Sequence, residues 1–300
     1  MRVIFFGSSA FAVPSLLEIG RAHDVIAVYT QADRPAGRGL KLTPTPVRIA
    51  AAGAGMPVFT PEKLDAVLCE AAAVLAPDVL VTASYGKILP RALLNVPALG
   101  ALNVHPSLLP QYRGATPIQA ALRDGLSATG VSIIWMSERM DAGDIALAET
   151  VAINPDDDFE SLHDRLAQVS AGLLRSALGA LAAGTLGRVA QDETKATFTR
   201  PIAKDDLRLA LDDASRSVNV VRSLSPKPGA WLEVGGQRVK VLQARTEDGA
   251  HDALAAPGDL LSLDGDGPLI ACRSGALRLL RVVPAGKPPM RGADFARSLR

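Results

Sequence analysis

Short apolar runs alternate with stretches of helical character through the first half of the chain, and this alternation constrains the fold most strongly. The apolar runs predict strands at 3–6, 25–30, 57–59, 78–83, 101–105, 130–136 and 145–153. Helices are predicted near 47–54, 62–75, 116–123 and 158–183. Strands that alternate with helices form mostly parallel sheets covered on both faces, so we expect a doubly wound, Rossmann-like α/β domain.

The first turn of this predicted sheet lacks the glycine fingerprint of nicotinamide enzymes. Gly7 stands alone, because Ser9 and Ala12 occupy the places of the second and third glycines. The second strand closes on Tyr29-Thr30-Gln31, without the acidic residue that would bind a ribose. A pyrophosphate-binding turn is therefore not predicted, although a different ligand can use the same crevice.

Two polar side chains stand at the carboxyl end of the predicted strand 101–105. Asn103 and His105 are two residues apart, so on a strand both point to one face. Open α/β sheets bind ligands at this end of their strands. An amide beside an imidazole can hydrogen-bond a carbonyl oxygen and move a proton. The alternative is a loop histidine bonded to backbone, with Asn103 acting in turn chemistry.

A carboxylate-rich turn at 138–144 supplies a candidate partner for His105. Asp141 lies 36 residues after His105, about the length of a β–α–β crossover, so the turn can fold back beside the imidazole. Asp141 is therefore a candidate to orient or ionise His105. Asp144 directly precedes the next predicted strand, and we interpret it as turn chemistry.

Two loops at the same predicted sheet edge each allow two interpretations. The segment 31–46 is long and rich in proline and glycine, and no acid interrupts its positive residues Arg34, Arg38 and Lys41 or the following Arg48. It is either a solvated surface loop or an arm that meets phosphates. Ser84–Pro90 is either a plain turn between strand and helix or a loop that presents backbone groups to a ligand.

The chain is long enough, at 300 residues, for about two domains. We predict a first, catalytic domain at 1–189, a polar linker at 190–206 and a second domain at 207–300. A helix at 214–224 and short strands separated by turns, among them Gly235-Gly236, predict a small β-barrel in the second domain. Residues 273–300 hold seven Lys/Arg against Asp294, so this tail is either a soluble basic end or a face for RNA phosphates.

Other features narrow the class of protein. The net charge of +1 does not by itself indicate a nucleic-acid partner. Cys69 and Cys272 lie far apart and are expected to be reduced thiols. The four histidines are scattered without metal-ligand spacing, so we expect no metal. Neither a signal peptide nor a membrane-spanning run is predicted, and we expect a cytoplasmic monomer.

Three motifs together resemble the signature of formyltransferases that use 10-formyltetrahydrofolate: Asn103-Val-His105, Ser107-Leu-Leu-Pro-Gln-Tyr-Arg-Gly114 and Met140-Asp-Ala-Gly-Asp144. The resemblance implies that Asn103, His105 and Asp141 are catalytic. It also implies that two loops bind the folate, through Tyr85, Gly86, Lys87, Ile88, Leu89, Ser107, Leu108, Leu109 and Pro110. Proline follows His105 where some relatives have glycine, but no proposed catalytic group is lost.

The arm and the tail resemble those of family members that formylate methionine on initiator tRNA. The similar segments are 30–47, 219–231 and 280–290, and one lysine, Lys41, stands in the arm where a fuller basic pair can occur. This resemblance implies a C-terminal barrel of OB-like type, initiator methionyl-tRNA as the acceptor and a role in translation initiation. The implied tRNA contacts are Arg34, Arg38, Lys41, Arg48, Arg278, Lys287 and Arg291.

Three other functions stay open on the sequence alone. A formyltransferase for a small-molecule amine would share the catalytic signature without needing the basic arm and the barrel. A hydrolase of the formyl-folate would use water as the acceptor. A non-catalytic RNA-binding protein on a Rossmann scaffold would leave the Asn103, His105 and Asp141 pattern unexplained.

Overall fold

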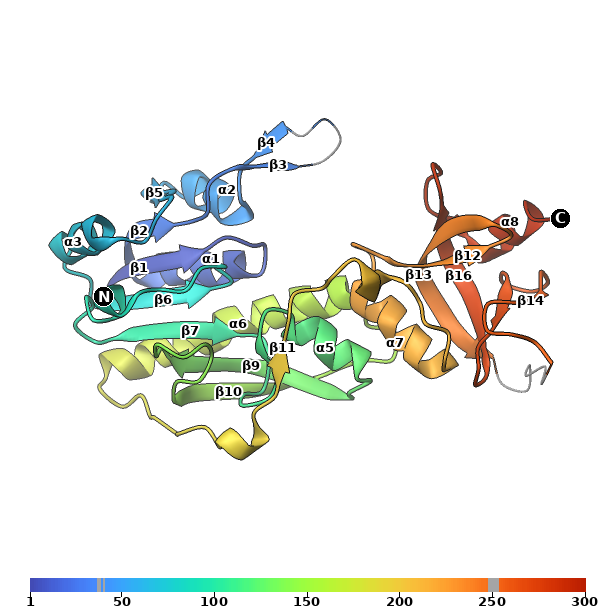
Figure 1. Cartoon of the computed structure of the whole chain (residues 1–300). Coiled ribbons are helices and arrows are strands. Elements are labelled where there is room, and N and C mark those ends of the chain that lie inside the picture. Colours follow the sequence, from blue (N-terminus) through green and yellow to red (C-terminus); the bar gives the residue numbers. More distant parts are fainter. Residues whose placement is uncertain (37–38, 40, 248–253) are drawn as a thin grey trace. The chain divides into compact units, whose positions relative to one another are not determined.

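The computed structural model describes residues 1–36, 39, 41–247 and 254–300 and divides the chain into two compact units (Figure 1). The first unit consists of Met1–Gly114, Thr129–Ala152 and His163–Phe198. The second consists of Ala115–Ala128, Ile153–Leu162 and Thr199–Arg300. The sequence-based boundaries of 1–189, 190–206 and 207–300 stay a prediction.

A seven-stranded sheet forms the centre of the first unit, in the order β10-β9-β7-β6-β1-β2-β5. Neighbouring strands pair in parallel from β7 to β5, whereas β9 runs antiparallel to β7. The strands are β1 Arg2–Gly7, β2 Asp24–Tyr29, β5 Val58–Phe59, β6 Val79–Ala83, β7 Ala101–His105, β9 Ala128–Trp135 and β10 Ile145–Ala152. The predicted mostly parallel α/β fold is confirmed.

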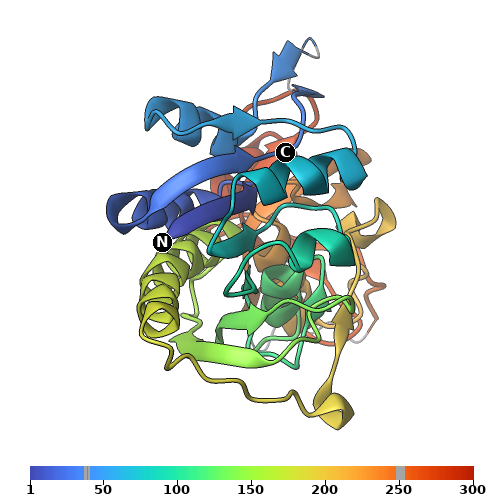
Figure 2. The ribbon, with the colours of Figure 1, turned by 90° about the vertical axis from the view of Figure 1, so that its left-hand side faces the viewer.

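Helices cover both faces of this sheet (Figure 2). They are α1 Ala12–Ala22, α2 Pro46–Gly53, α3 Ala66–Val74, α4 Arg91–Leu94 and α6 Phe159–Ala182. On one face, Phe6 of β1 and Leu80 of β6 share a buried cluster with Leu68 of α3 and Leu93 of α4. On the other face, an ion pair of 2.7 Å between Arg175 and Glu18 joins α6 to α1.

Side-chain caps decide where two helices of the first unit begin. Asp65 Oδ1 accepts a hydrogen bond of 3.2 Å from Leu68 N, so α3 begins at Ala66 and not at 62 as predicted from the sequence. Thr45 Oγ1 accepts one of 3.0 Å from Arg48 N, and Pro46 follows at the first position of α2.

The arm at 31–46 is not an irregular loop throughout, because part of it is an antiparallel hairpin. Strand β3 Arg34–Ala36 pairs with β4 Lys41–Thr43. The base of the hairpin is tied down, since the Thr30 and Thr45 hydroxyls are 2.6 Å apart and Arg48 Nη1 lies 2.6 Å from Asp33 Oδ1. Arg38 lies outside the described residues.

A curved antiparallel sheet, in the order β12-β13-β16-β15-β14 with β17 beside β16, forms the second unit (Figure 1). Its elements are α5 Pro117–Arg123, α7 Ala214–Leu224, β12 Ala230–Val234, β13 Gln237–Glu247, β14 Leu260–Ser262, β15 Leu269–Ala271, β16 Ala276–Pro284, β17 Met290–Arg291 and α8 Gly292–Arg297. Val221, Val239 and Leu279 belong to its core. The predicted hairpin turn at Gly235-Gly236 is confirmed: both φ angles are positive, +57° and +75°, as a tight hairpin requires.

Among the described residues, the remaining elements are the paired strands β8 Arg113–Gly114 and β11 Phe198–Thr199 and the short 3-10 helices Glu193–Lys195 and Asp205–Leu207. Within the described ranges, no helix is long and apolar enough to cross a membrane. Nor does any group of three His, Cys, Asp or Glu residues in those ranges have the arrangement of a metal site. Cys69 and Cys272 are free and buried.

Candidate active site

Strand β7 presents Asn103 and His105 at the carboxyl end of the sheet, on one face because they are two residues apart. Thr82 of the neighbouring β6 pairs with Asn103 in the strand register, and its Oγ1 donates to Asn103 Oδ1 at 2.6 Å. The other end of the amide, Asn103 Nδ2, points to Asp141 Oδ1 at 3.4 Å. A hydroxyl can donate or accept, whereas a carboxylate only accepts, so the contact with Asp141 indicates which end of the amide is Nδ2.

His105 is almost fully buried, at 4% exposure. Its Nε2 lies 3.0 Å from Tyr112 O, and its Nδ1 lies 3.6 Å from Asp141 Oδ2. A carbonyl oxygen accepts and never donates, so Nε2 bears the hydrogen in this contact. The remaining nitrogen, Nδ1, therefore faces the carboxylate, an arrangement in which a proton can pass between the two groups.

Asp141 lies in the turn between β9 and β10 and is beside His105, as the sequence predicts. The connection from β7 is not the predicted β–α–β crossover, because β9 runs antiparallel to β7. Its backbone has φ +51°, a left-handed conformation that is uncommon for a residue other than glycine. Its Oδ2 accepts a hydrogen bond of 2.8 Å from Gly114 N. The carboxylate thus contacts three groups at once: the Asn103 amide, the His105 ring and a backbone N–H.

The loop Ser107–Pro110 follows β7 directly and is fastened to β9 through Ser132. Ser132 Oγ donates to Ser107 O at 2.8 Å and accepts from Leu109 N at 3.1 Å. Leu108 lies over Gly130, where a Cβ atom would be 2.4 Å from Leu108 Cδ2 and 2.2 Å from Glu149 O. Only glycine fits there, so the strand backbone forms part of the wall behind Leu108.

The loop after β6 combines buried and exposed side chains. The Tyr85 ring packs edge-on against Phe6 with centroids 5.2 Å apart, and burial raises the pKa of Tyr85 to about 12. Leu89 is buried, whereas Gly86 and Ile88 are exposed. Lys87 Nζ donates to two backbone carbonyls, Pro61 O at 3.2 Å and Glu62 O at 2.8 Å. Lys87 therefore holds the segment before α3 to this loop.

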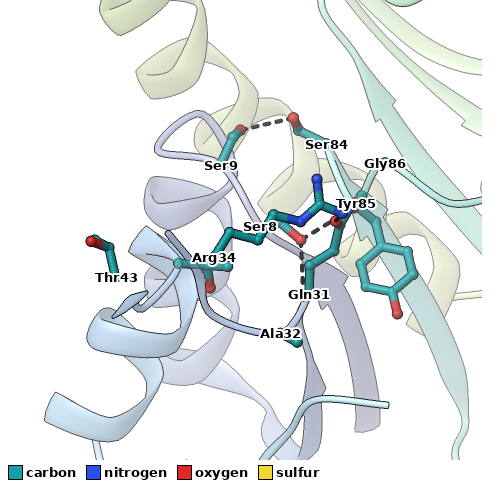
Figure 3. A pocket seen from close by; sticks show the side chains of 10 residues that line it. Ser8, Ser9, Gln31, Ala32, Arg34, Thr43, Ser84, Tyr85 and Gly86 are labelled. Carbon is teal, nitrogen blue, oxygen red and sulfur yellow. Dashed lines mark hydrogen bonds between the residues drawn. The ribbon is translucent and has the colours of Figure 1, made fainter. Parts of the chain in front are cut away.

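A hollow of about 310 Å³, lined by several hydroxyl groups, opens beside this loop (Figure 3). It lies at the carboxyl ends of β1, β2 and β6, where the strand order reverses and α/β sheets bind ligands. Ser9 and Ser84 face each other across it, with their hydroxyls 2.8 Å apart. The lining comes from two loops and the base of the hairpin: Ser8, Ser9, Gln31, Ala32, Arg34, Thr43, Thr45, Ser84, Tyr85 and Gly86.

The basic residues predicted to contact tRNA differ in exposure. Arg34 and Lys41 are exposed on the hairpin, and Arg48 is paired with Asp33 at its base. Lys287 and Arg291 are exposed in the second unit. Arg278 is different. Its side chain is 7% exposed, pairs with Glu247 at 2.9 Å and donates to Gly267 O at 2.8 Å. Its guanidinium is thus bound within its own unit.

Some residues that shape the site have no strong sequence signal. Thr82 is a single polar residue in a buried strand, and only its register next to Asn103 gives it a role. Ser132 is likewise buried in β9. Gln191 lies in the segment predicted as a linker, yet its side chain contacts the Asp141 turn. A polar residue inside an apolar strand is the one signal that points to the first two.

Comparison with known proteins identifies the class to which this fold and site belong. Residues 1–178 match the family model described as formyl transferase, and residues 201–300 match the model of the formyl transferase C-terminal domain. The chain therefore belongs to the formyl transferase family.

Relatives that match over the full length of this chain share one name within the family. The methionyl-tRNA formyltransferase of Methylobacterium sp. (strain 4-46) is 45% identical over 307 residues, which cover 100% of this chain and 97% of that protein. The methionyl-tRNA formyltransferase of Moorella thermoacetica is 40% identical over 298 residues, which cover 98% of this chain and 95% of that protein. The resemblance seen in the motifs thus extends over the whole chain.

Solved structures share the fold at lower identity. The N-formyltransferase from Helicobacter canadensis, in complex with folinic acid and dTDP-3-aminofucose, aligns with a TM-score of 0.69 and 16% identity, covering 95% of this chain and 99% of that one. HypX from Aquifex aeolicus, in complex with tetrahydrofolic acid, aligns with a TM-score of 0.66 and 19% identity, covering 100% of this chain and 47% of that one.

Proposed function

We propose that this protein transfers the formyl group of 10-formyltetrahydrofolate to the α-amino group of methionine on initiator tRNA, for translation initiation. The observation that carries the proposal is the cluster of Asn103, His105 and Asp141, whose polar atoms lie 3.4–3.6 Å apart at the carboxyl end of the sheet. The full-length relatives are named for this reaction. We further propose that the protein works as a monomer in the cytoplasm.

The reaction exchanges one carbon–nitrogen bond for another. The neutral α-amine attacks the formyl carbon, the bond from that carbon to N10 of the folate breaks, and N10 takes up a proton. Negative charge builds on the formyl oxygen, so a hydrogen-bond donor fixed beside it lowers the barrier by about 3 kcal/mol. Asn103 Nδ2 is the donor that we assign, because its long contact of 3.4 Å with Asp141 can give way to a substrate oxygen.

We assign to Asp141 and His105 the role of accepting the proton that leaves the amine. Asp141 is the more exposed of the two, so its carboxylate meets the amine directly or through water. The His105 Nδ1 beside it then shares the proton, while Nε2 stays bonded to Tyr112 O. His105 therefore acts through Asp141 here, and the expectation that it also binds the formyl oxygen is replaced by this assignment.

The folate is proposed to lie between the two loops at this edge of the sheet. Tyr85–Leu89 and Ser107–Pro110 follow the neighbouring strands β6 and β7, so both reach the end of the sheet where Asn103 lies. Leu89 and Leu109 are buried and Leu108 is half-buried, which offers an apolar wall to a planar ring. The backbone of both loops supplies polar groups to fix its orientation, whereas the Ser107 hydroxyl is buried and donates to Gln111 O at 2.7 Å.

The tRNA is proposed to meet the basic hairpin and the second unit. Arg34, Lys41 and Arg48 supply positive charge beside the hollow of about 310 Å³, whose hydroxyl-rich lining suits the sugar and phosphate of the acceptor end. Arg38, outside the described residues, is proposed as a tRNA contact from the sequence alone. In the second unit, which we propose to be an OB-like domain over residues 207–300, Lys287 and Arg291 are exposed. Arg278 is assigned to structure, because its guanidinium is bound to Glu247.

A choice of acceptors tests the proposal. Purified protein is mixed with 10-formyltetrahydrofolate and, separately, with initiator methionyl-tRNA, glycinamide ribonucleotide, a dTDP-linked amino sugar or buffer alone. The proposal predicts formyl-methionine on the tRNA and no comparable turnover with the other acceptors. Faster formylation of a small amine, or release of formate into buffer at the same rate, would contradict it. Asn103→Ala and Asp141→Ala serve as the inactive controls.

A further inference from the structure

A strap of residues 187–193 lies against the end of β9 and the start of β10, the two strands joined by the Asp141 turn. Trp135 Nε1 at the end of β9 donates to Gly187 O at 2.9 Å, and the Arg188 guanidinium lies 3.7 Å from the centre of the Trp135 ring. Val189 and Ile145 exchange two backbone hydrogen bonds of 2.8 and 2.9 Å. The strap is thus fixed to both strands that flank the Asp141 turn, although its sequence predicts a linker.

The Gln191 side chain uses both ends of its amide inside the site. Its Nε2 donates to Asp141 O at 2.8 Å and to Gly143 O at 2.7 Å. Its Oε1 accepts from Arg113 Nε at 3.1 Å and from Arg113 Nη2 at 2.8 Å. A side-chain amide has two N–H donors and two acceptor positions, so these four bonds use its full capacity.

Arg113, the other partner of Gln191, belongs to the segment that contacts the catalytic cluster. It is 1% exposed, and its guanidinium also binds both carboxylate oxygens of Glu193 at 3.0–3.1 Å. The Arg113 and Arg139 guanidinium groups hold the pKa of Glu193 below its usual value. On either side of Arg113, Tyr112 O meets the His105 ring and Gly114 N meets the Asp141 carboxylate.

The Asp141 turn needs such support because its backbone is strained and tightly enclosed. Asp141 has φ +51°, which an aspartate adopts only at some cost. At Gly143 a Cβ atom would lie 1.7 Å from Trp135 O, so the turn passes directly over the backbone of β9. The two hydrogen bonds from Gln191 bind the carbonyl groups of these same two residues.

We propose that Gln191 is a positioning residue for formyl transfer. By bridging Arg113 and the Asp141 turn, it sets the Asp141 carboxylate against the His105 ring and the Asn103 amide. The inference rests on the proposed roles of Asp141 and His105. A displacement of about 1 Å of a group of this kind lowers turnover by about 100-fold, so the bridge affects rate more than binding.

Gln191→Glu is the sharpest test, because it keeps the length of the side chain and the acceptor for Arg113. It removes both N–H donors and sets a carboxylate against the carbonyl groups of Asp141 and Gly143. We expect kcat for formylation of initiator methionyl-tRNA to fall about 10- to 100-fold. KM for tRNA and for the folate should stay within about 2-fold, because Gln191 lies behind the turn and is not assigned to either substrate. Gln191→Ala should behave likewise.

Asp192→Asn is the matched control. Asp192 is the next residue and is bonded within its own turn to Thr194 and Lys195, and asparagine preserves the cap. Its kcat should equal that of the wild type. A second comparison uses Asp141→Asn: in that background Gln191→Ala should add less than about 2-fold, because the residue acts through the carboxylate already removed.

A readout without substrate separates this inference from the proposed function. The ring ¹⁵N signals of His105, assigned with a His105→Asn variant, report the surroundings of the ring in the full-length protein. Gln191→Ala, which adds no charge, should displace these signals at a fixed pH, and Asp192→Asn should leave them in place. Unchanged signals together with wild-type kcat overturn the inference, even if the melting temperature falls. If the wild type does not formylate the tRNA, the proposed function fails, and the His105 signals alone then decide the role of Gln191.

Discussion

Replacing Thr82 by valine tests how the Asn103 amide is aimed. Thr82 is 4% exposed, and its Oγ1 donates to Asn103 Oδ1 at 2.6 Å. Valine has nearly the same shape without the hydroxyl, so Asn103 Oδ1 loses its donor. An unsatisfied polar group of this kind costs about 1–3 kcal/mol of stability. The Asn103 amide then keeps only its contact of 3.4 Å with the Asp141 carboxylate, so Nδ2 is held less firmly in the place where it would meet the formyl oxygen.

The expected fall in kcat follows from how much the Asn103 Nδ2 donor lowers the activation free energy. Complete loss of one such donor raises the activation free energy by about 3–4 kcal/mol. For a donor that is present but less well oriented we expect a rise of about 1.4 kcal/mol, which corresponds to a tenfold fall in kcat. The assay is formylation of initiator methionyl-tRNA at saturating folate, with thermal unfolding measured in parallel. Ser170→Ala in α6 is the control, since it removes a buried hydroxyl bonded to Leu166 O at 2.7 Å far from the site. A Thr82→Val variant that loses stability but keeps full kcat would refute the reasoning.

Three further predictions concern other parts of the chain. Gly130→Ala should lower the unfolding temperature and raise KM for the folate, measured by thermal unfolding and steady-state kinetics, because its Cβ would lie 2.2 Å from Glu149 O and 2.4 Å from Leu108 Cδ2. Lys41→Ala should weaken tRNA binding and lower the slope of log affinity against log salt by about 1, and an unchanged slope would argue against phosphate contact. Arg200 lowers the pKa of Asp206 to about 2 from its usual 3.8, so its contribution to stability is complete above pH 4 and is lost as the pH falls toward 2. Asp206→Asn should therefore lower the unfolding temperature at pH 7, and most of this difference should be lost by pH 2, where the native carboxyl is half protonated.

Much of the architecture follows from local patterns in the sequence. The helix at 214–224 is predicted to the residue, because Asp213 caps it and its apolar side chains recur at helical spacing. The mostly parallel sheet follows from the alternation of strands and helices, whereas the order of its strands is not predicted. Asp141 lies beside His105 as predicted, but β9 runs antiparallel to β7, so the crossover argument does not explain its place.

Other features depend on partners distant in the chain. Gln191 lies 50 residues after Asp141 and binds a backbone carbonyl there, and no spacing rule predicts such a contact. The sequence does not predict the hairpin of β3 and β4, because each strand is only three residues long and β3 contains Pro35, a residue uncommon in strands. The sequence predicts Arg278 to be an exposed charge in a basic tail. In the structure Arg278 is buried and pairs with Glu247 of the neighbouring strand β13.

The most direct test of the account is the single-turnover rate of formyl transfer to initiator methionyl-tRNA by Asn103→Ala, measured with enzyme in excess so that product release plays no part. The Asn103 side chain is only half-buried and makes two hydrogen bonds, to Thr82 and Asp141. The protein should therefore still fold when this side chain is removed. Loss of the donor at the formyl oxygen predicts a rate about 100- to 1,000-fold below that of the wild type. A rate within about 3-fold of the wild type would show that Asn103 does not stabilise the charge on the formyl oxygen, and it would contradict the proposed site.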